Sequence, residues 1–130
     1  MIGSFAGVDA AAAAAKRSLG VDLNKEAAGV PARLQKLGLT PGVPTLFISE
    51  AVLFYLSPPA KRTLLADCAK WICEADGSAL ALTDNLAPFV RSPSADEAAE
   101  LLEGFDLELQ RHDSLWGGAI QFLHATAKTA

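Results

Sequence analysis

The spacing of apolar residues changes along the chain, and each change marks a predicted element. Continuous apolar runs over residues 45–49 and 79–83 predict strands buried on both faces, as in the centre of a parallel sheet. Helical spacing between these runs predicts a helix that begins after Ser57, its N-cap, and ends near Cys73. The apolar stripe of this helix consists of Leu64, Leu65, Cys68 and Ile72.

The first third of the chain predicts shorter elements. Residues 2–8 indicate a strand, and the alanine-rich stretch 10–19 indicates a helix with Asp9 as its N-cap. Residues 21–23 are read as the end of another strand. Residues 31–37 predict a helix because Pro31 suits the first turn and Gly38 the stop. Residues 51–56 fit either a strand or a helix.

The last third of the chain predicts one helix and two strands. Residues 94–97 have the form of a capping box, which opens a helix ended by Gly104. Residues 107–115 and 119–126 indicate two strands separated by a pair of glycines, and the short connection makes them antiparallel. The alternation of strands and helices predicts an α/β fold, with a mostly parallel sheet, an antiparallel C-terminal strand and helices on both faces.

Composition narrows the function classes. A chain of 130 residues with 51% hydrophobic residues has room for one domain, over residues 1–130. Its net charge of −4 argues against a nucleic acid or an anionic membrane as partner. No apolar run is long enough to span a membrane and no signal segment is visible, so we expect a cytoplasmic protein. Cys68 and Cys73 lie on different sides of one predicted helix, so we expect no metal site.

Acidic residues follow the predicted strands. Because ligands bind outside the carboxyl ends of parallel strands, Asp9, Asp22, Glu50 and Asp84, with Asn85, are candidate ligand-binding residues. The alternative for each is that it caps the helix or turn that follows. Glu50 stands between two apolar segments, which predicts a semi-buried carboxylate with a specific partner.

One segment resembles a known family. Residues 44–56 begin with Pro-Thr-Leu and continue through Glu50 to an apolar stretch that contains Tyr55 and Leu56. This pattern resembles the signature of the leucine carboxyl methyltransferase family. Members of this family are class I S-adenosylmethionine-dependent methyltransferases with a Rossmann-like sheet. The resemblance also takes in Asp22-Leu23, and Asp22 precedes Glu50 by 28 positions.

The resemblance implies roles for these residues. Asp9 would hold the ribose of S-adenosylmethionine, Asp22 and Leu23 would border its adenine, and Glu50 would lie near its amino or sulfonium group. Five residues are assigned to a substrate pocket: Tyr55, Asp84, Asn85, His112 and Trp116. For Tyr55 the alternative is a core aromatic residue, and for His112 it is a structural or solvent-facing histidine.

The family's first strand, its Gly-rich loop and an upstream arginine are not found before Asp9. We therefore expect a partial methyltransferase domain that resembles the C-terminal portion of the family fold and binds the cofactor weakly by itself. Exposed strand edges in such a domain predict a homodimer or a completing second chain.

The function expected from the resemblance is O-methylation of a carboxylate, on a protein C-terminus or a small molecule, because an ionised carboxylate needs no general base. The alternatives are a catalytically inactive fragment that acts through protein association, and an unrelated α/β binding domain.

Overall fold

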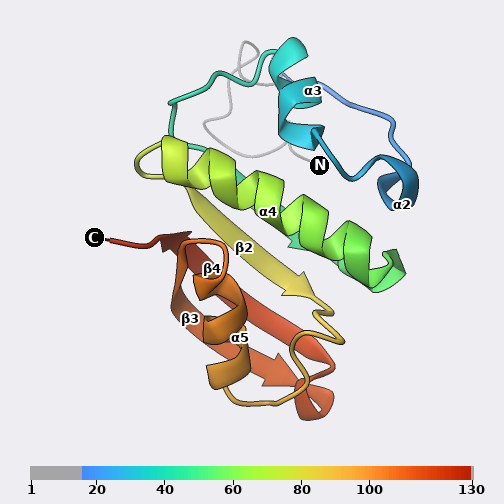
Figure 1. Ribbon diagram of the computed structural model, residues 1–130, viewed down its shortest axis with the longest axis vertical. Helices are drawn as coiled ribbons and strands as arrows, with labels where there is room; N and C mark the ends of the chain where they lie inside the picture. Colours follow the sequence, from blue (N-terminus) through green and yellow to red (C-terminus); the bar gives the residue numbers. More distant parts are fainter. Residues whose placement is uncertain (1–15, 130) are drawn as a thin grey trace, which may run out of the picture.

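Four strands form one mixed sheet in the order β1-β2-β4-β3, and Figure 1 shows β2, β4 and β3 side by side. Strand β1 (Leu46–Glu50) runs parallel to β2 (Ala79–Asp84), β4 (Ile120–Ala127) is antiparallel to β2, and β3 (Leu107–Leu115) is antiparallel to β4. The computed structural model describes residues 16–129, so the predictions for Asp9 and for the strand at residues 2–8 lie outside the described residues.

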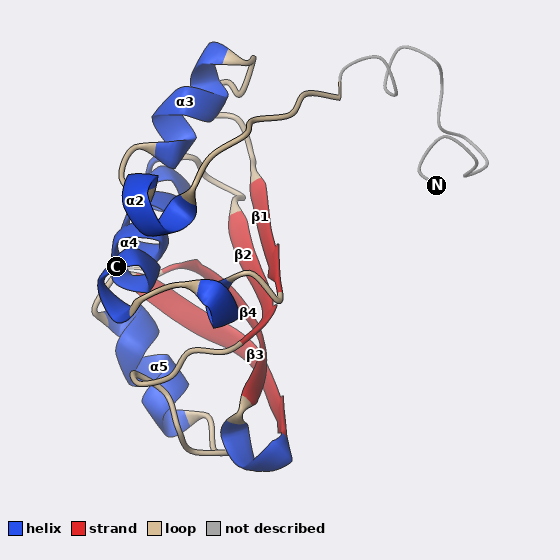
Figure 2. Ribbon diagram, turned by 90° about the vertical axis from the view of Figure 1, so that its right-hand side faces the viewer, coloured by secondary structure: helices blue, strands red, loops and turns tan. Residues whose placement is uncertain are grey.

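The helices that the structure describes all lie on one side of this sheet (Figure 2). They are α2 (Leu23–Glu26), α3 (Val30–Lys36), α4 (Pro58–Glu74) and α5 (Asp96–Glu103). The prediction of an α/β fold with an antiparallel end is confirmed, but in the described residues the sheet is not mostly parallel and its second face carries no helix. The reason is that only β1 and β2 form a parallel pair in this part of the chain.

Packing between α4 and the sheet forms the core. Leu65 and Ile72 on α4 lie in one buried cluster with Leu80, Leu82 and Leu123, as the helical spacing predicts. The sequence predicts that the strands at residues 45–49 and 79–83 are each buried on two faces. This prediction is wrong, because Leu46 and Ile48 on β1 are 58% and 71% exposed. An apolar run shows that a strand suits burial, but it does not show which of its faces is covered.

Two local predictions are wrong in detail, and the structure settles the choice between strand and helix at residues 51–56. Residues 16–20 are irregular, so the described end of the predicted 10–19 segment is not helical. Residues 21–23 form no strand; Asp22 caps α2 instead. Residues 51–56 contain a short 3-10 helix, η2 (Leu53–Tyr55).

The capping box before α5 does not form, although the helix does. Ala95 is the N-cap and makes no side-chain cap bond. The carboxylate of Glu97 accepts hydrogen bonds from the backbone N–H groups of Arg91 and Ser92, at 2.6 and 3.1 Å. These bonds lower the pKa of Glu97, since they favour the charged carboxylate. Glu97 therefore holds the loop before α5 rather than the first turn of the helix.

The β3–β4 connection is a second 3-10 helix, η3 (Trp116–Gly118), fastened to the loop before α5. The side chain of Gln121 is fully buried and donates to the carbonyl groups of Gly118, at 2.7 Å, and Ser92, at 3.3 Å. Its carbonyl oxygen lies 2.6 Å from Nε2 of His112. This network closes the sheet at the end where β1 and β2 finish.

Candidate functional site

Asp84 organises the carboxyl ends of β1 and β2. It is fully buried at the end of β2. Its Oδ2 accepts from the Ser49 hydroxyl and from the N–H groups of Val52 and Leu53, at 2.8, 2.9 and 3.0 Å. Its Oδ1 accepts from the N–H groups of Phe54 and Asn85, at 3.1 and 2.9 Å. Asp84 therefore fixes the loop that follows β1, and its assignment to a substrate pocket stays a prediction.

The chain reverses sharply at Ala51 to deliver these N–H groups. Ala51 has φ of +52°, a left-handed conformation that is costly for a residue with a Cβ. Its N–H still donates to the carbonyl of Thr83 at 3.0 Å, as the last bond between β1 and β2. Backbone strain of this kind persists where surrounding contacts hold it, and the Asp84 carboxylate supplies those contacts.

Lys61 fixes the corresponding loop after β2. Its ammonium group donates to the backbone carbonyls of Asn85 and Ala87, at 3.0 and 2.7 Å, and to the Asn85 side chain at 3.2 Å. The residue is only 4% exposed. Burial lowers the pKa of Lys61, while the nearby Asp84 carboxylate acts in the opposite direction. Opposite buried charges thus fasten the two loops that end the parallel strands.

Asn24 connects the α2 segment to the loop after β1. Its side chain donates to the carbonyl of Tyr55 at 2.9 Å and accepts from the N–H of Ser57 at 2.8 Å. Asp22, two residues earlier, accepts from the N–H of Asn24 at 3.1 Å and caps α2. Asn24 was not identified from the sequence, because its partners lie more than 30 positions away.

An apolar cavity of about 290 Å³ lies between α2, α3, β1 and α4. Leu23 lines it together with Ile48, Ser49 and Val52 at the end of β1. The structure thus brings Leu23 and the end of β1 to one cavity, although they are far apart in the sequence. The remaining lining residues are Leu19, Val21, Val30, Leu34, Phe47, Leu53, Leu64, Leu65, Cys68, Leu80 and Leu82.

Glu50 ends β1 beside this cavity, but its environment differs from the prediction. The structure shows Glu50 exposed, so the prediction of a semi-buried carboxylate is wrong, and no hydrogen bond to another described residue fixes it. Its position at the strand end points it away from the helix layer, as alternation along β1 requires. Glu50 is therefore a carboxylate that solvent or a ligand can reach.

The other predicted pocket residues are dispersed. Tyr55 and Trp116 are 78% and 79% exposed, so Tyr55 is not a core aromatic residue. Trp116 lies at the β3–β4 connection, and His112 on β3 is half-buried against Gln121. Asn85 uses its amide to hold the carbonyls and N–H groups of neighbouring loops. These residues share one end of the sheet without forming a common cavity in the described chain.

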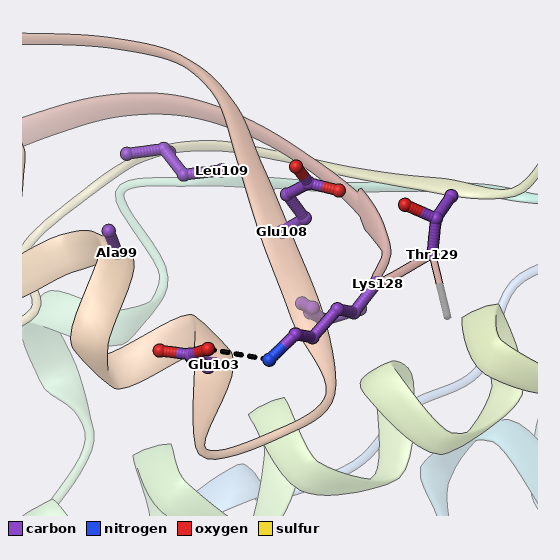
Figure 3. A pocket seen from close by; sticks show the side chains of 7 residues that line it. Ala99, Glu103, Glu108, Leu109, Lys128 and Thr129 are labelled. Atoms are coloured by element: carbon purple, nitrogen blue, oxygen red, sulfur yellow. Dashed lines mark hydrogen bonds and ion pairs between the residues drawn. The ribbon is translucent and has the colours of Figure 1, made fainter.

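A second cavity of about 290 Å³ lies at the opposite end of the sheet (Figure 3). Glu103 from α5 and Lys128 after β4 form an ion pair across it. The pair lowers the pKa of Glu103 and raises that of Lys128. Because this cavity lies away from the carboxyl ends of the parallel strands, we do not assign the candidate site to it.

Other chemistry is not assembled in the part that the structure describes. Burial raises the pKa of the Cys68 thiol to about 12, so it stays protonated. Among residues 16–129, no group of three or more His, Cys, Asp or Glu side chains is arranged to hold a metal ion. None of the helices in that range combines the length and apolar character needed to cross a bilayer.

Comparison with known families adds one finding. Residues 4–69 match the family model described as leucine carboxyl methyltransferase, which is half of the chain. The match contains α2, α3, β1 and the cavity residues Leu23, Ser49 and Val52, together with Glu50. Asp84, Asn85, His112 and Trp116 lie outside it. No curated protein that was compared with the chain matches it significantly.

Proposed function

Because this chain belongs to the leucine carboxyl methyltransferase family, a family of methyltransferases, we propose that it takes S-adenosylmethionine as methyl donor. We place the adenosine part of the donor in the apolar cavity beside β1. The observation that carries the proposal is the meeting of Leu23 with Ser49 and Val52 around that cavity. All these residues lie within the matched range.

The cavity suits this group on chemical grounds. A flat heteroaromatic base gains binding energy from apolar side chains on its faces, and Leu23 and Val52 offer such surface. Polar parts of the ligand need partners. The hydroxyl oxygen of Ser49, a lining residue, can accept a hydrogen bond, and the exposed Glu50 ends the same strand. Asp84 and Asn24 hold the surrounding loops in place, so little ordering is left to occur on binding.

When bound, S-adenosylmethionine supplies a methyl group that leaves its sulfonium sulfur for the acceptor, and the sulfur keeps the electron pair of the broken bond. This chain's residues then have to bind and orient both reactants and keep water out. Leu23 and Val52 supply the apolar contact, and the loop fixed by Asp84 sets where the acceptor approaches.

We further propose a carboxylate oxygen as acceptor. No histidine, aspartate or glutamate lines the cavity within the described residues, and Cys68 is protonated. An acceptor that is already ionised at neutral pH needs no base, which favours a carboxylate over a hydroxyl. Transfer of labelled methyl to a peptide with a free C-terminus should give an ester that releases methanol in alkali. Transfer only to a base-stable position, or equally to the amidated peptide, would contradict a carboxylate acceptor.

Cofactor binding is tested by calorimetric titration of S-adenosylmethionine into the chain. We expect a Kd of roughly 0.1–1 mM, because contacts to one nucleoside carry the affinity. Val52→Arg fills the cavity with a charged side chain and should weaken binding at least about tenfold. Val52 binds Asp84 only through its backbone N–H, which the substitution keeps.

Val43→Arg is the matched control, since Val43 is an exposed valine that does not line the cavity. It should leave the Kd unchanged. Equal losses in the two variants, or no binding at millimolar concentrations, would contradict the proposed site.

The second candidate function is a non-catalytic role through association with another chain. The observation that favours it is the free outer edge of β1 in the described residues. Binding of S-adenosylmethionine without methyl transfer to any carboxylate, in a chain that associates through β1, would support this function over catalysis.

A further inference from the structure

The two edge strands of the sheet differ in how they are protected against pairing. Strand β3 carries a β-bulge between Leu109 and Arg111, and charged side chains, among them Glu108 and Asp113, stand along it. Bulges and charges of this kind keep an edge from pairing with another chain. Strand β1 pairs with β2 in unbroken register and has one charged residue, Glu50, at its end.

The backbone of β1 offers hydrogen-bonding groups to its outer side. The carbonyl of Thr45 and the N–H of Ala51 both face β2, where they bond to Ala79 and Thr83 at 2.9 and 3.0 Å. Because backbone groups alternate along a strand, those of Leu46, Ile48 and Glu50 face outward. No other described strand pairs with them.

Apolar side chains flank this edge. Leu46 and Ile48 alternate along β1 with Phe47, so they lie on the opposite face from it, and both are more than half exposed. The helices that the structure describes lie on the other side of the sheet (Figure 2). Beside them on β2, Ala79 and Ala81 are small. On the other face, Phe47 lines the apolar cavity. An extended apolar segment laid along β1 would therefore find hydrogen bonds at its backbone and apolar contacts on both of its faces.

We propose that the outer edge of β1 is a strand-addition surface whose occupant is β1 of a second copy of this chain. An antiparallel pair with its two-fold axis at Ile48 places Ile48 opposite Ile48 of the partner subunit. Leu46 then stands opposite Glu50 of the partner subunit. In this register every outward N–H and C=O of Leu46, Ile48 and Glu50 is paired, because opposite residues of a hydrogen-bonded pair exchange both bonds. The two sheets become one continuous sheet.

Self-association is favoured because β1 supplies both halves of this pairing, as an isologous interface requires. The interface is small: a five-residue strand covers well under the roughly 800 Å² per partner of a stable complex. We therefore expect a reversible dimer that forms in the micromolar range or above, rather than a permanent one. The proposal rests on the edge of β1 and does not depend on the cofactor site.

The experiment is sedimentation of the full chain over a range of concentrations, combined with amide hydrogen exchange of residues 46–50. We expect a monomer–dimer equilibrium, with protection of the Ile48 and Glu50 amides that rises with concentration. Ile48→Lys should weaken the association at least tenfold, because a lysine on an edge strand opposes pairing. The side chain is exposed, so the fold of the monomer should be kept.

Leu115→Lys is the matched control, because Leu115 is a half-exposed leucine on the opposite edge strand. It should leave the dimer unchanged. A monomer with unprotected Ile48 and Glu50 amides at every concentration would overturn the proposal. A monomer with protected amides would also overturn it, because a segment of the same chain would then occupy the edge. Equal losses in the two lysine variants would assign the dimer to another surface.

Discussion

Asp84→Ala is expected to destabilise the chain by about 3–5 kcal/mol, the range seen when one partner of a buried charge network is removed. The substitution leaves the N–H groups of Val52, Leu53 and Phe54 without their acceptor. It also removes the carboxylate whose charge opposes the effect of burial on the pKa of Lys61. A domain of this size has a total stability of about 5–15 kcal/mol, so the loss is severe. Urea unfolding followed by circular dichroism measures it.

Asp84→Asn and Asp113→Ala make this prediction specific. Asparagine keeps the shape of the side chain and one acceptor oxygen, so Asp84→Asn should destabilise the chain less than Asp84→Ala does. Asp113 is exposed, and within residues 16–129 its side chain accepts one hydrogen bond, from the N–H of Ser114 at 2.8 Å. Its removal should therefore change the stability by less than about 0.5 kcal/mol. Similar losses for Asp84→Ala and Asp113→Ala would contradict the role given to Asp84.

Gly118→Ala is expected to cost about 3 kcal/mol, because two effects add. Gly118 has φ of +102°, which disfavours any residue with a Cβ. A Cβ at this position would also lie 2.5 Å from the carbonyl oxygen of Arg91 and 2.9 Å from that of Ser92. Both contacts are with backbone, which cannot move aside like a flexible side chain, so the β3–β4 connection must shift away from the loop before α5.

Gly117→Ala separates the two effects. Gly117 also has a positive φ, of +65°, but a Cβ there would meet no atom within 4 Å. It should therefore cost only about 1 kcal/mol, the penalty of the left-handed conformation. Thermal unfolding of the two variants compares them directly, and a loss for Gly117→Ala as large as that for Gly118→Ala would show that steric contact with Arg91 and Ser92 contributes nothing.

The regular elements of the described chain were predictable because their signals are local. The apolar run before Glu50 predicts β1, and Ser57 with Pro58 predicts the start of α4, whose N-cap bond the structure confirms. Coverage of the sheet was not predictable, because exposure of Ile48 depends on what packs against β1. Asp22 illustrates a competing local signal: residues 21–23 fit the end of a strand, but Asp22 caps a helix instead.

The candidate site was predictable only in part. The resemblance to the methyltransferase family identified Leu23 and Glu50, and the structure places Leu23 at the cavity that the end of β1 also lines. Asn24 and Lys61 carried no sequence signal, since a polar residue on a predicted surface gives no indication of a distant partner. The exposure of Glu50 was also missed, because the apolar segments on either side of it suggested burial.

The central claim is that Leu23 and the end of β1 form the adenosine-binding part of the site. The most direct measurement is the change in backbone amide chemical shifts as S-adenosylhomocysteine, the product of methyl transfer, is added to the full chain. We predict that shifts concentrate at Leu23, Ser49, Glu50 and Val52, and that Val52→Arg abolishes them. Shifts confined to the distant cavity at Glu103 and Lys128, or none at millimolar ligand, would contradict the claim.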